Sequence, residues 1–211
     1  MSLAERAYER LEELITTLKL QPGASVSEAE LSEEIGMGRT PIREALQRLA
    51  REHLIIIMPR RGMVIAPIDV AAQMRLLEVR RSVESVIATS AARKATPDER
   101  RRFAEIAHAF IESAERNDDV SFMRIDRAFN EALIHAARNE FAAGAMSLMS
   151  GLARRFWFLH WRNAADMGLA ARLHAAIADA VARGEPAEAD QATKALMDYL
   201  ESFTRASLDL A

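Results

Sequence analysis

Arginine side chains gather in one short stretch of this 211-residue chain. Residues 39–63 hold six arginines and two glutamates, net +4, whereas residues 1–38 hold three basic and eight acidic side chains, net −5. Arg39 and Arg43 open a predicted helix, and Arg61 and Gly62 follow after a β-rich run. A guanidinium can contact phosphates, and in the major groove it can reach O6 and N7 of guanine. The stretch favours contact with double-stranded DNA, although a solvated arginine-rich face would have the same composition.

A second set of side chains capable of chemistry lies in the other half of the chain. Asp126 and Asn130 are one helical turn apart on a face with apolar neighbours, and His174 lies among apolar residues. His160 is part of an aromatic stretch, and Tyr199 lies beside leucines. Buried carboxylates and imidazoles need partners or a metal to offset desolvation. The set could bind a metal or a ligand, but a lone histidine on an apolar face is more often an ordinary core residue than a ligand.

Arg80 and Glu84 are four residues apart, which places them on neighbouring turns of one helix face. A guanidinium pairs with a carboxylate through two parallel hydrogen bonds. Arg80 is therefore the best candidate for contact with an anionic ligand. The alternative is an ion pair on the surface.

The elements that position the first arginines form a predicted helix-turn-helix and wing. Ser27 caps one helix with Glu30 three residues later, and Gly36 ends it. We expect Thr40 to cap the second helix, with Arg39, Arg43 and Arg48 pointing outward. Two β-rich runs, 54–58 and 63–66, follow, with the turn Pro59-Arg60-Arg61-Gly62 between them.

The rest of the chain predicts an all-α second domain. Pro67 separates a winged helix-turn-helix domain at 1–67 from a helical domain at 68–211. The fold class is therefore mostly α, with a small β-hairpin in the first domain and an antiparallel helical bundle in the second. We expect helices at roughly 70–94, 97–116, 119–137, 140–162, 167–183 and 186–208.

Composition excludes several classes of protein. The chain has no cysteine, so it has no disulfide framework and no cysteine-based metal site or nucleophile. No apolar run approaches the roughly 18 residues of a membrane span, and the N-terminus lacks the apolar core of a signal peptide. These features predict a cytoplasmic protein without a membrane partner.

The stretch GRTPIREALQRLAREHL followed by PRRG resembles the winged helix of GntR-type bacterial transcription regulators, and the resemblance extends over about the first 66 residues. It implies a homodimer on a two-fold-symmetric DNA operator. It also implies that Arg39, Thr40, Arg43 and Gly62 approach the DNA, with Arg61 beside the last. The chain departs from the pattern at Gly38, where many members have serine or threonine, and at His53, where a glycine usually precedes the hairpin.

Residues 70–208 resemble the effector-binding domain of the FadR branch, called the FCD domain, in its six-helix VanR-like form. The pieces that carry the resemblance are LLEVRRSVE, DRAFNEALIHAARN and RLHAAIADAVARGEP. Many members bind zinc or nickel through an aspartate and three histidines, and the metal holds a carboxylate. Asp126 and His174 match two of these ligands, Asn130 replaces a histidine, and the last histidine falls near Tyr199. An asparagine oxygen is a weak ligand for either metal.

These observations predict a DNA-binding regulator that is controlled by a small carboxylate metabolite, rather than an enzyme. Relief of repression by the ligand is the commoner behaviour that the resemblance implies. The ligand would contact Arg80, His160, His174 and Tyr199, with or without a metal at Asp126, Asn130 and His174. One alternative is a DNA-binding protein whose bundle only dimerises. A remote one is a metal-dependent hydrolase using Asp126 and His174.

Overall fold

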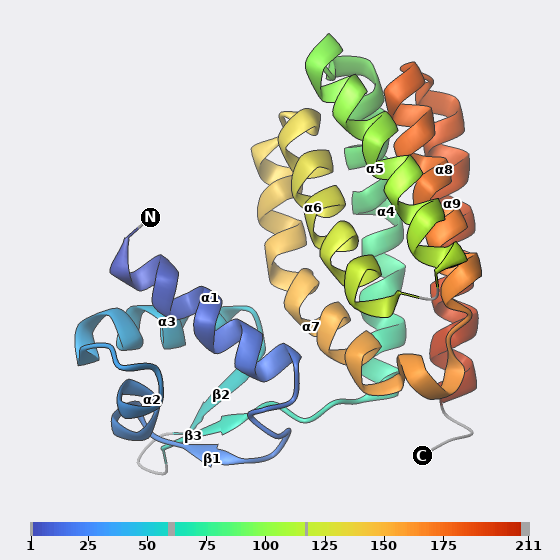
Figure 1. Cartoon of the computed structure of the whole chain (residues 1–211). Helices are drawn as coiled ribbons and strands as arrows, with labels where there is room; N and C mark the ends of the chain where they lie inside the picture. The colour runs from blue at the N-terminus through green and yellow to red at the C-terminus, as the bar shows by residue number, and fades with distance from the viewer. Residues whose placement is uncertain (1, 59–61, 117, 208–211) are drawn as a thin grey trace. The chain divides into compact units, whose positions relative to one another are not determined.

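The computed structural model describes residues 2–58, 62–116 and 118–207. Its residues divide into two compact units, one formed by 1–73 with 147–160, the other by 74–146 with 161–211. Over the described ranges the chain is mostly helical with one small antiparallel sheet, which confirms the predicted fold class (Figure 1). The first elements are α1 (Leu3–Thr16), β1 (Ser25–Val26), α2 (Glu28–Ile35), α3 (Arg39–Arg51), β2 (Ile55–Met58) and β3 (Gly62–Ile65).

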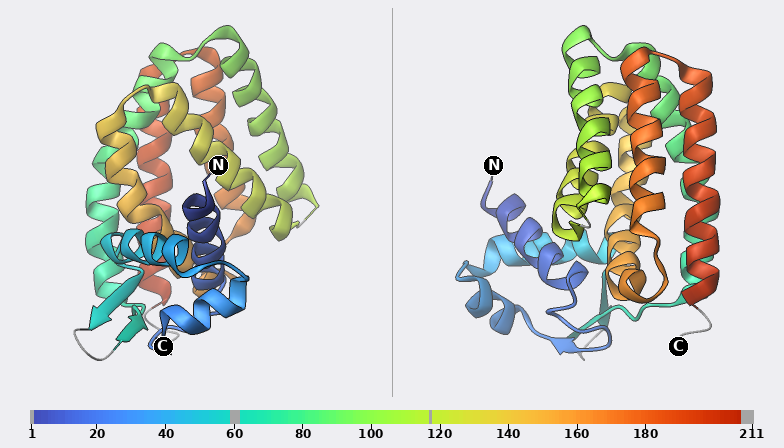
Figure 2. Two further views of the ribbon diagram at one scale, coloured as in Figure 1. Left: turned by 90° about the vertical axis from the view of Figure 1, so that its left-hand side faces the viewer. Right: turned by 45° about the vertical axis from the view of Figure 1, so that its right-hand side comes forward.

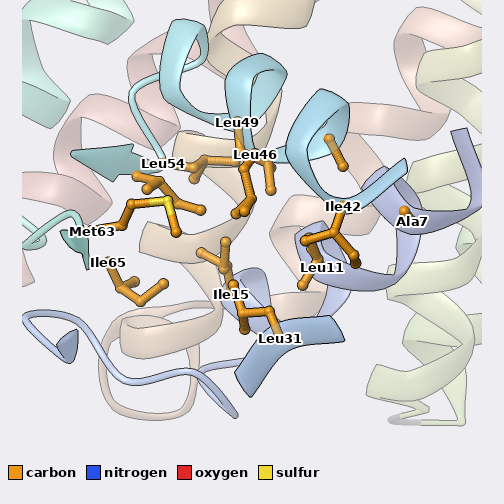
Figure 3. Close-up of a cluster of buried hydrophobic side chains, with 12 residues drawn as sticks. Ala7, Leu11, Ile15, Leu31, Ile42, Leu46, Leu49, Leu54, Met63 and Ile65 are labelled. Carbon is orange, nitrogen blue, oxygen red and sulfur yellow. The ribbon is translucent and has the colours of Figure 1, made fainter. Parts of the chain in front are cut away.

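The first unit contains the predicted helix-turn-helix, and its sheet has one strand more than expected. The sheet order is β1-β3-β2, with Ser25 opposite Val64 and Ile56 opposite the same valine. The two-residue strand β1 has too few residues to show an alternating pattern, and its pairing with β3 defines it. Buried side chains of α1, α2, α3 and the sheet form a single apolar cluster (Figure 3): Ala7, Leu11, Ile15, Leu31, Ile42, Ala45, Leu46, Leu49, Leu54, Ile55, Met63 and Ile65.

The predicted caps of α2 are confirmed, whereas the predicted cap of α3 is wrong. Ser27 and Glu30 form a reciprocal capping box, and Gly36 ends α2 in the left-handed region at φ +65°. The N-cap of α3 lies two residues earlier than expected, at Gly38 instead of Thr40, and makes no side-chain capping hydrogen bond. Thr40 therefore lies inside the first turn of α3. Its hydroxyl does not close the helix end, so that side chain stays exposed beside Arg39.

His53 ends α3 in a conformation that favours glycine. Its φ is +58°, and its N–H donates to the carbonyl of Ala50. The next N–H, of Leu54, donates to the carbonyl of Leu49 at 2.9 Å. These two bonds are the Schellman arrangement, in which the residue after the cap is left-handed. The geometry explains why a glycine at position 53 would suit the turn into β2.

The remaining elements form the predicted six-helix region. They are α4 (Val70–Lys94), α5 (Pro97–Glu115), α6 (Asp119–Ala137), α7 (Glu140–Ala164), α8 (Met167–Arg183) and α9 (Pro186–Ala206), each within two residues of its expected bounds. In the second unit α5 packs against α8 and α6, and α8 packs against α9 (Figure 2). Phe103, Phe110 and Phe129 are among the largest fully buried side chains there.

One arginine joins three helix ends of the second unit. The guanidinium of Arg100, near the start of α5, donates to the carbonyls of Ala92, Ala95 and Arg183 at 3.2–3.3 Å. These carbonyls belong to the end of α4, the residue after it and the end of α8, where no intrahelical N–H reaches them. Gly184, at φ +74°, lies against this guanidinium. The side chain thus replaces backbone donors that the helices themselves lack.

The middle of α7 belongs to the first unit, and its arginines contact the N-terminal part of the chain there. Arg155 is buried and donates to the carbonyls of Ala66 and Pro67 at 2.7 and 3.1 Å. Burial lowers the pKa of Arg155 to about 10. Arg154 forms an ion pair with the buried Glu12 of α1. The residues just after β3 are therefore fixed by a helix that is distant in sequence.

Candidate DNA-binding surface and effector site

The N-terminal turns of α3 present the predicted DNA-contacting side chains to solvent. Arg39, Thr40 and Arg43 are all exposed, and the Arg43 side chain is 62% exposed. The apolar side of the same helix is buried against α1, so its polar side must face outward. A helix N-terminus with exposed arginines and a hydroxyl suits both phosphate contact and guanine recognition.

Arg43 is not free in this structure, because it pairs with a glutamate of the preceding helix. Its Nε donates to Oε1 of Glu28 at 3.2 Å, and its Nη2 donates to Oε2 at 3.0 Å. The hydrogen bond from Arg43 lowers the pKa of Glu28 below its ordinary value. Sequence reasoning missed Glu28, since nothing in its spacing links it to a residue fifteen positions later.

The predicted wing is described in part. Gly62 opens β3 at φ +87°, a value that side-chain-bearing residues rarely adopt. Its exposed position leaves the backbone accessible. Arg61, the other predicted wing contact, lies outside the described residues together with residues 59 and 60.

Arg48 does not point freely outward, contrary to the sequence-based expectation. Its guanidinium carbon lies 3.5 Å from the centroid of the Tyr8 ring. Its Nε donates to Oε1 of the buried Glu52 at 2.9 Å, and the Tyr8 hydroxyl donates to Oε2 at 2.7 Å. The attraction of a carboxylate and an aromatic face thus holds Arg48 against α1. Its role is in the packing of α1 on α3.

In the second unit, a buried ion pair joins two of the predicted site residues. Nε2 of His174 on α8 lies 3.2 Å from Oδ1 of Asp126 on α6. The other ring nitrogen, Nδ1, lies 2.7 Å from the carbonyl oxygen of Ala170, which can only accept. Both ring nitrogens therefore face acceptors, an arrangement that suits the doubly protonated imidazolium.

The surroundings of His174 act on its charge in opposite directions. Burial alone would lower its pKa, but the hydrogen bond to Asp126, the charge of that carboxylate, the Ala170 carbonyl and the charge of Glu84 together raise it. Three rings, which sequence reasoning did not single out, surround the imidazole at centroid distances of 5.1–5.9 Å: Phe110, Phe122 and Phe129. In the sequence, these phenylalanines show only the apolar spacing that is typical of any helical core.

The predicted Arg80–Glu84 pair is confirmed, and it lies inside the bundle. Nε of Arg80 donates to Oε1 of Glu84 at 2.7 Å, and both side chains are only 13% exposed. The charge of Glu84 acts on His174, so this pair and the Asp126–His174 pair interact electrostatically, and we call their four side chains the polar network. Its side chains come from α4, α6 and α8, and all four are mostly buried.

The described residues do not fit a tightly held metal. Asn130 directs its amide nitrogen to Asp126, donating to its backbone oxygen at 2.9 Å and to Oδ1 at 3.0 Å. An amide N–H is no metal ligand, and an asparagine oxygen is a weak ligand for zinc or nickel. Among the residues that the structure describes, no group of three His, Cys, Asp or Glu side chains is placed to hold a metal ion.

The other two predicted ligand contacts are engaged elsewhere. His160 belongs to the first unit, where its ring lies 4.6 Å from that of Phe156, and burial lowers its pKa. The Tyr199 hydroxyl donates to the backbone oxygen of Asp166 at 3.0 Å, at the start of α8. Burial raises the pKa of Tyr199 to about 12. Asp126, Asn130 and His174 are in direct contact, whereas Arg80 is linked to them through the charge of its partner Glu84.

Comparison with known proteins accounts for both halves of the chain. Residues 3–65 match bacterial regulatory proteins of the gntR family, and residues 75–199 match the FCD domain. The chain is 24% identical over 200 residues to the transcriptional repressor RspR of Escherichia coli, covering 95% of this chain and 86% of RspR. It is 28% identical over 209 residues to the galactonate operon transcriptional repressor of E. coli, covering 89% of each.

A solved structure shares the fold. The E. coli protein McbR/YncC superposes with a TM-score of 0.80 at 17% identity, over the full length of both chains. At this identity the likeness is one of fold. No described helix combines the length and the apolar character needed to cross a membrane.

Proposed function

This chain belongs to the gntR family of bacterial regulatory proteins and carries an FCD domain, and we propose that it is a repressor whose DNA binding responds to a small carboxylate. The matched families and relatives are transcription regulators rather than enzymes, so the hydrolase alternative is rejected. In this proposal Arg39, Thr40, Arg43 and the wing around Arg61 and Gly62 contact operator DNA. Two copies of the chain occupy the two halves of the operator.

The observation that carries the ligand-responsive part is the polar network inside the bundle. Arg80, Glu84, Asp126 and His174 are all mostly buried, with side-chain exposures of 12–19%. Taking charges out of water costs several kcal/mol per ion before pairing offsets the cost. A bundle that served only for dimerisation would gain more from apolar side chains at these positions. The network therefore favours a ligand-binding bundle over the alternative in which the bundle only dimerises.

The chemistry of the network favours a carboxylate ligand. Glu84 already supplies one carboxylate to Arg80, and a ligand carboxylate can take its place on the same donors. His174 adds a second cationic partner in the same network when it is protonated. One relative is named for the galactonate operon, and galactonate is itself a small carboxylate. Asn130 would offer its amide to the hydroxyl groups of such a ligand.

No metal is needed for this binding. Some FCD domains bind metals, but in this chain Asn130 donates to Asp126 through its amide nitrogen, which leaves Asp126 and His174 as the two strong ligands of the predicted set. Arg80 and His174 provide the positive charge that a metal would otherwise supply. The ligand acts by binding one arrangement of the bundle more tightly than another, which shifts the population that can bind DNA.

The experiment is a thermal-shift screen of small carboxylates, galactonate among them, followed by DNA binding in the presence of each one that binds. We expect a ligand to raise the melting temperature of the wild-type protein and of Arg75→Ala, which removes an exposed arginine of the same helix. We expect no such shift for Arg80→Ala, because the carboxylate loses its two donors. An equal shift in Arg80→Ala would contradict the proposed site.

A further inference from the structure

Glu28 occupies the guanidinium that the proposed function assigns to DNA. The two hydrogen bonds of 3.0 and 3.2 Å from Arg43 run in parallel to the two oxygens of one carboxylate. The charge of Arg39 also acts on Glu28, so the carboxylate lies within reach of both arginines at the start of α3. An acidic side chain thus lies beside the arginines that would approach DNA.

The pair contributes little to folding stability. The Arg43 side chain is 62% exposed and the Glu28 side chain 36% exposed. Ion pairs between exposed side chains gain little, because water screens the attraction and both side chains lose conformational freedom. The main effect of the ion pair is therefore on the availability of Arg43 for other partners. Removal of the Glu28 charge should leave the domain folded.

Glu28 competes unequally with the two kinds of DNA contact. On non-specific DNA, a phosphate can replace the Glu28 carboxylate as the partner of Arg43. The new ion pair is no stronger than the one it replaces. A guanine in the correct register offers O6 and N7 together, in a plane that matches the guanidinium. The Glu28 carboxylate also repels the phosphate backbone of every duplex. Only at the correct site do base contacts offset this unfavourable electrostatic free energy.

We propose that Glu28 is a specificity-determining residue, which keeps Arg43 paired on non-specific DNA and releases it where a base pair offers two acceptors. The inference rests on the proposed DNA contact of Arg43. It adds a residue that need not touch the DNA. Its effect is on the ratio between specific and non-specific affinity.

The test compares Glu28→Gln with Glu30→Gln. Both variants remove one negative charge from the first turn of α2, but Glu30 is bonded to the N–H of Ser27, a role that glutamine also fills. A duplex selected from random DNA by the wild-type protein and a scrambled duplex of equal length and composition serve as probes. Fluorescence anisotropy over a range of salt concentrations gives both dissociation constants.

For Glu28→Gln we expect tighter binding to the scrambled duplex and a specificity ratio that falls by about fivefold or more, the lower end of what one bidentate base contact contributes. For Glu30→Gln the ratio should stay at the wild-type value. A ratio in Glu28→Gln that stays equal to that of Glu30→Gln, or rises, would overturn the inference, whatever the absolute affinities.

Arg43→Ala separates this inference from the proposed function. If Arg43→Ala binds the selected duplex as tightly as the wild type, the proposed DNA contact itself fails. If Arg43→Ala weakens that binding and Glu28→Gln behaves as Glu30→Gln does, the contact stands and the role of Glu28 fails. In the Arg43→Ala background, Glu28→Gln should no longer lower the specificity ratio, since its partner is gone.

Discussion

His174 and Asp126 form an ion pair in the interior of the bundle, with Nε2 of the imidazole 3.2 Å from Oδ1 of the carboxylate. The two residues come from different helices, α8 and α6, and are 48 positions apart in the sequence. The second ring nitrogen faces the carbonyl of Ala170. The bundle therefore holds a charged group in its core by giving it an acceptor on each side.

This arrangement predicts a loss of stability as the pH rises. The pKa of His174 is raised in the folded protein above its ordinary value of 6.5. The stabilisation from its charge is fully present below pH 6.5, about the pKa of the unfolded chain, and disappears as the pH rises through the folded pKa. The melting temperature should thus fall across this interval in the wild type and in His108→Gln, which changes an exposed histidine. A His174→Gln protein with the same decrease would show that another group is responsible.

A small substitution at Gly184 should cause a large loss of folding stability. A β-carbon at this position would overlap the guanidinium of Arg100, 2.5 Å from its Cζ, and the backbone φ of +74° is left-handed. Gly184→Ala should therefore lose about 1–3 kcal/mol from backbone strain and from the displaced hydrogen bonds of Arg100. Chemical denaturation monitored by circular dichroism measures the change.

The matched control is Gly144→Ala in α7. Nothing lies within 4 Å of a β-carbon there, and the residue is inside a helix. Alanine should be neutral or stabilising by up to about 1 kcal/mol, because it restricts the unfolded chain and favours the helix. Equal destabilisation of both variants would mean that the Arg100 contact is unimportant.

His53→Gly should stabilise the DNA-binding half. The left-handed φ of +58° costs an L-residue about 1–2 kcal/mol, and glycine avoids this cost while losing some entropy on folding. We expect a small increase in the melting temperature of the transition that includes α3, measured by calorimetry. His53→Ala keeps the strain and should show no increase; an increase there as well would place the gain in the lost imidazole instead.

Arg48→Met should lower stability and leave DNA selectivity almost unchanged. The substitution removes the cation from the Tyr8 ring and leaves the buried Glu52 with one hydrogen-bond partner fewer. Loss of a partner from a buried carboxylate is destabilising. Thermal unfolding and anisotropy on selected and scrambled duplexes measure the two effects. A fall in the selectivity ratio as large as that for Arg43→Ala would return Arg48 to the DNA surface.

Most of the fold could be predicted because its signals are local. Ser27 with Glu30 and Gly36 each specify a helix end through their own backbone or the next turn. The same holds for Thr96 with Glu99 at the start of α5 and for Gly184 at the end of α8. Such caps need no knowledge of the tertiary fold, so the helix bounds agree with expectation to within two residues.

The remaining features depend on specific contacts between residues, several of them distant in sequence. The strand β1 exists because β3 pairs with it, and Arg48 lies inward because Tyr8 and Glu52 attract it. The amide nitrogen of Asn130 donates to Asp126, a residue on the preceding turn of the same helix. The role of Glu28 depends on the hydrogen bonds that it accepts from Arg43 of the next helix. In each case the sequence gives the type of residue, but the role of that residue depends on a contact that the sequence does not predict.

We propose that the side chains at the start of α3 contact operator DNA, and Arg43→Ala tests this contact most directly. The control is Arg127→Ala, which removes an exposed arginine of α6 that is also paired with a glutamate, Glu131, at 3.1 Å. Both are titrated by anisotropy against the duplex selected by the wild-type protein. We expect Arg43→Ala to lose about tenfold or more in affinity, within the range for one bidentate base contact, and Arg127→Ala to bind as the wild type does. Equal affinity of Arg43→Ala and Arg127→Ala for that duplex would contradict the account.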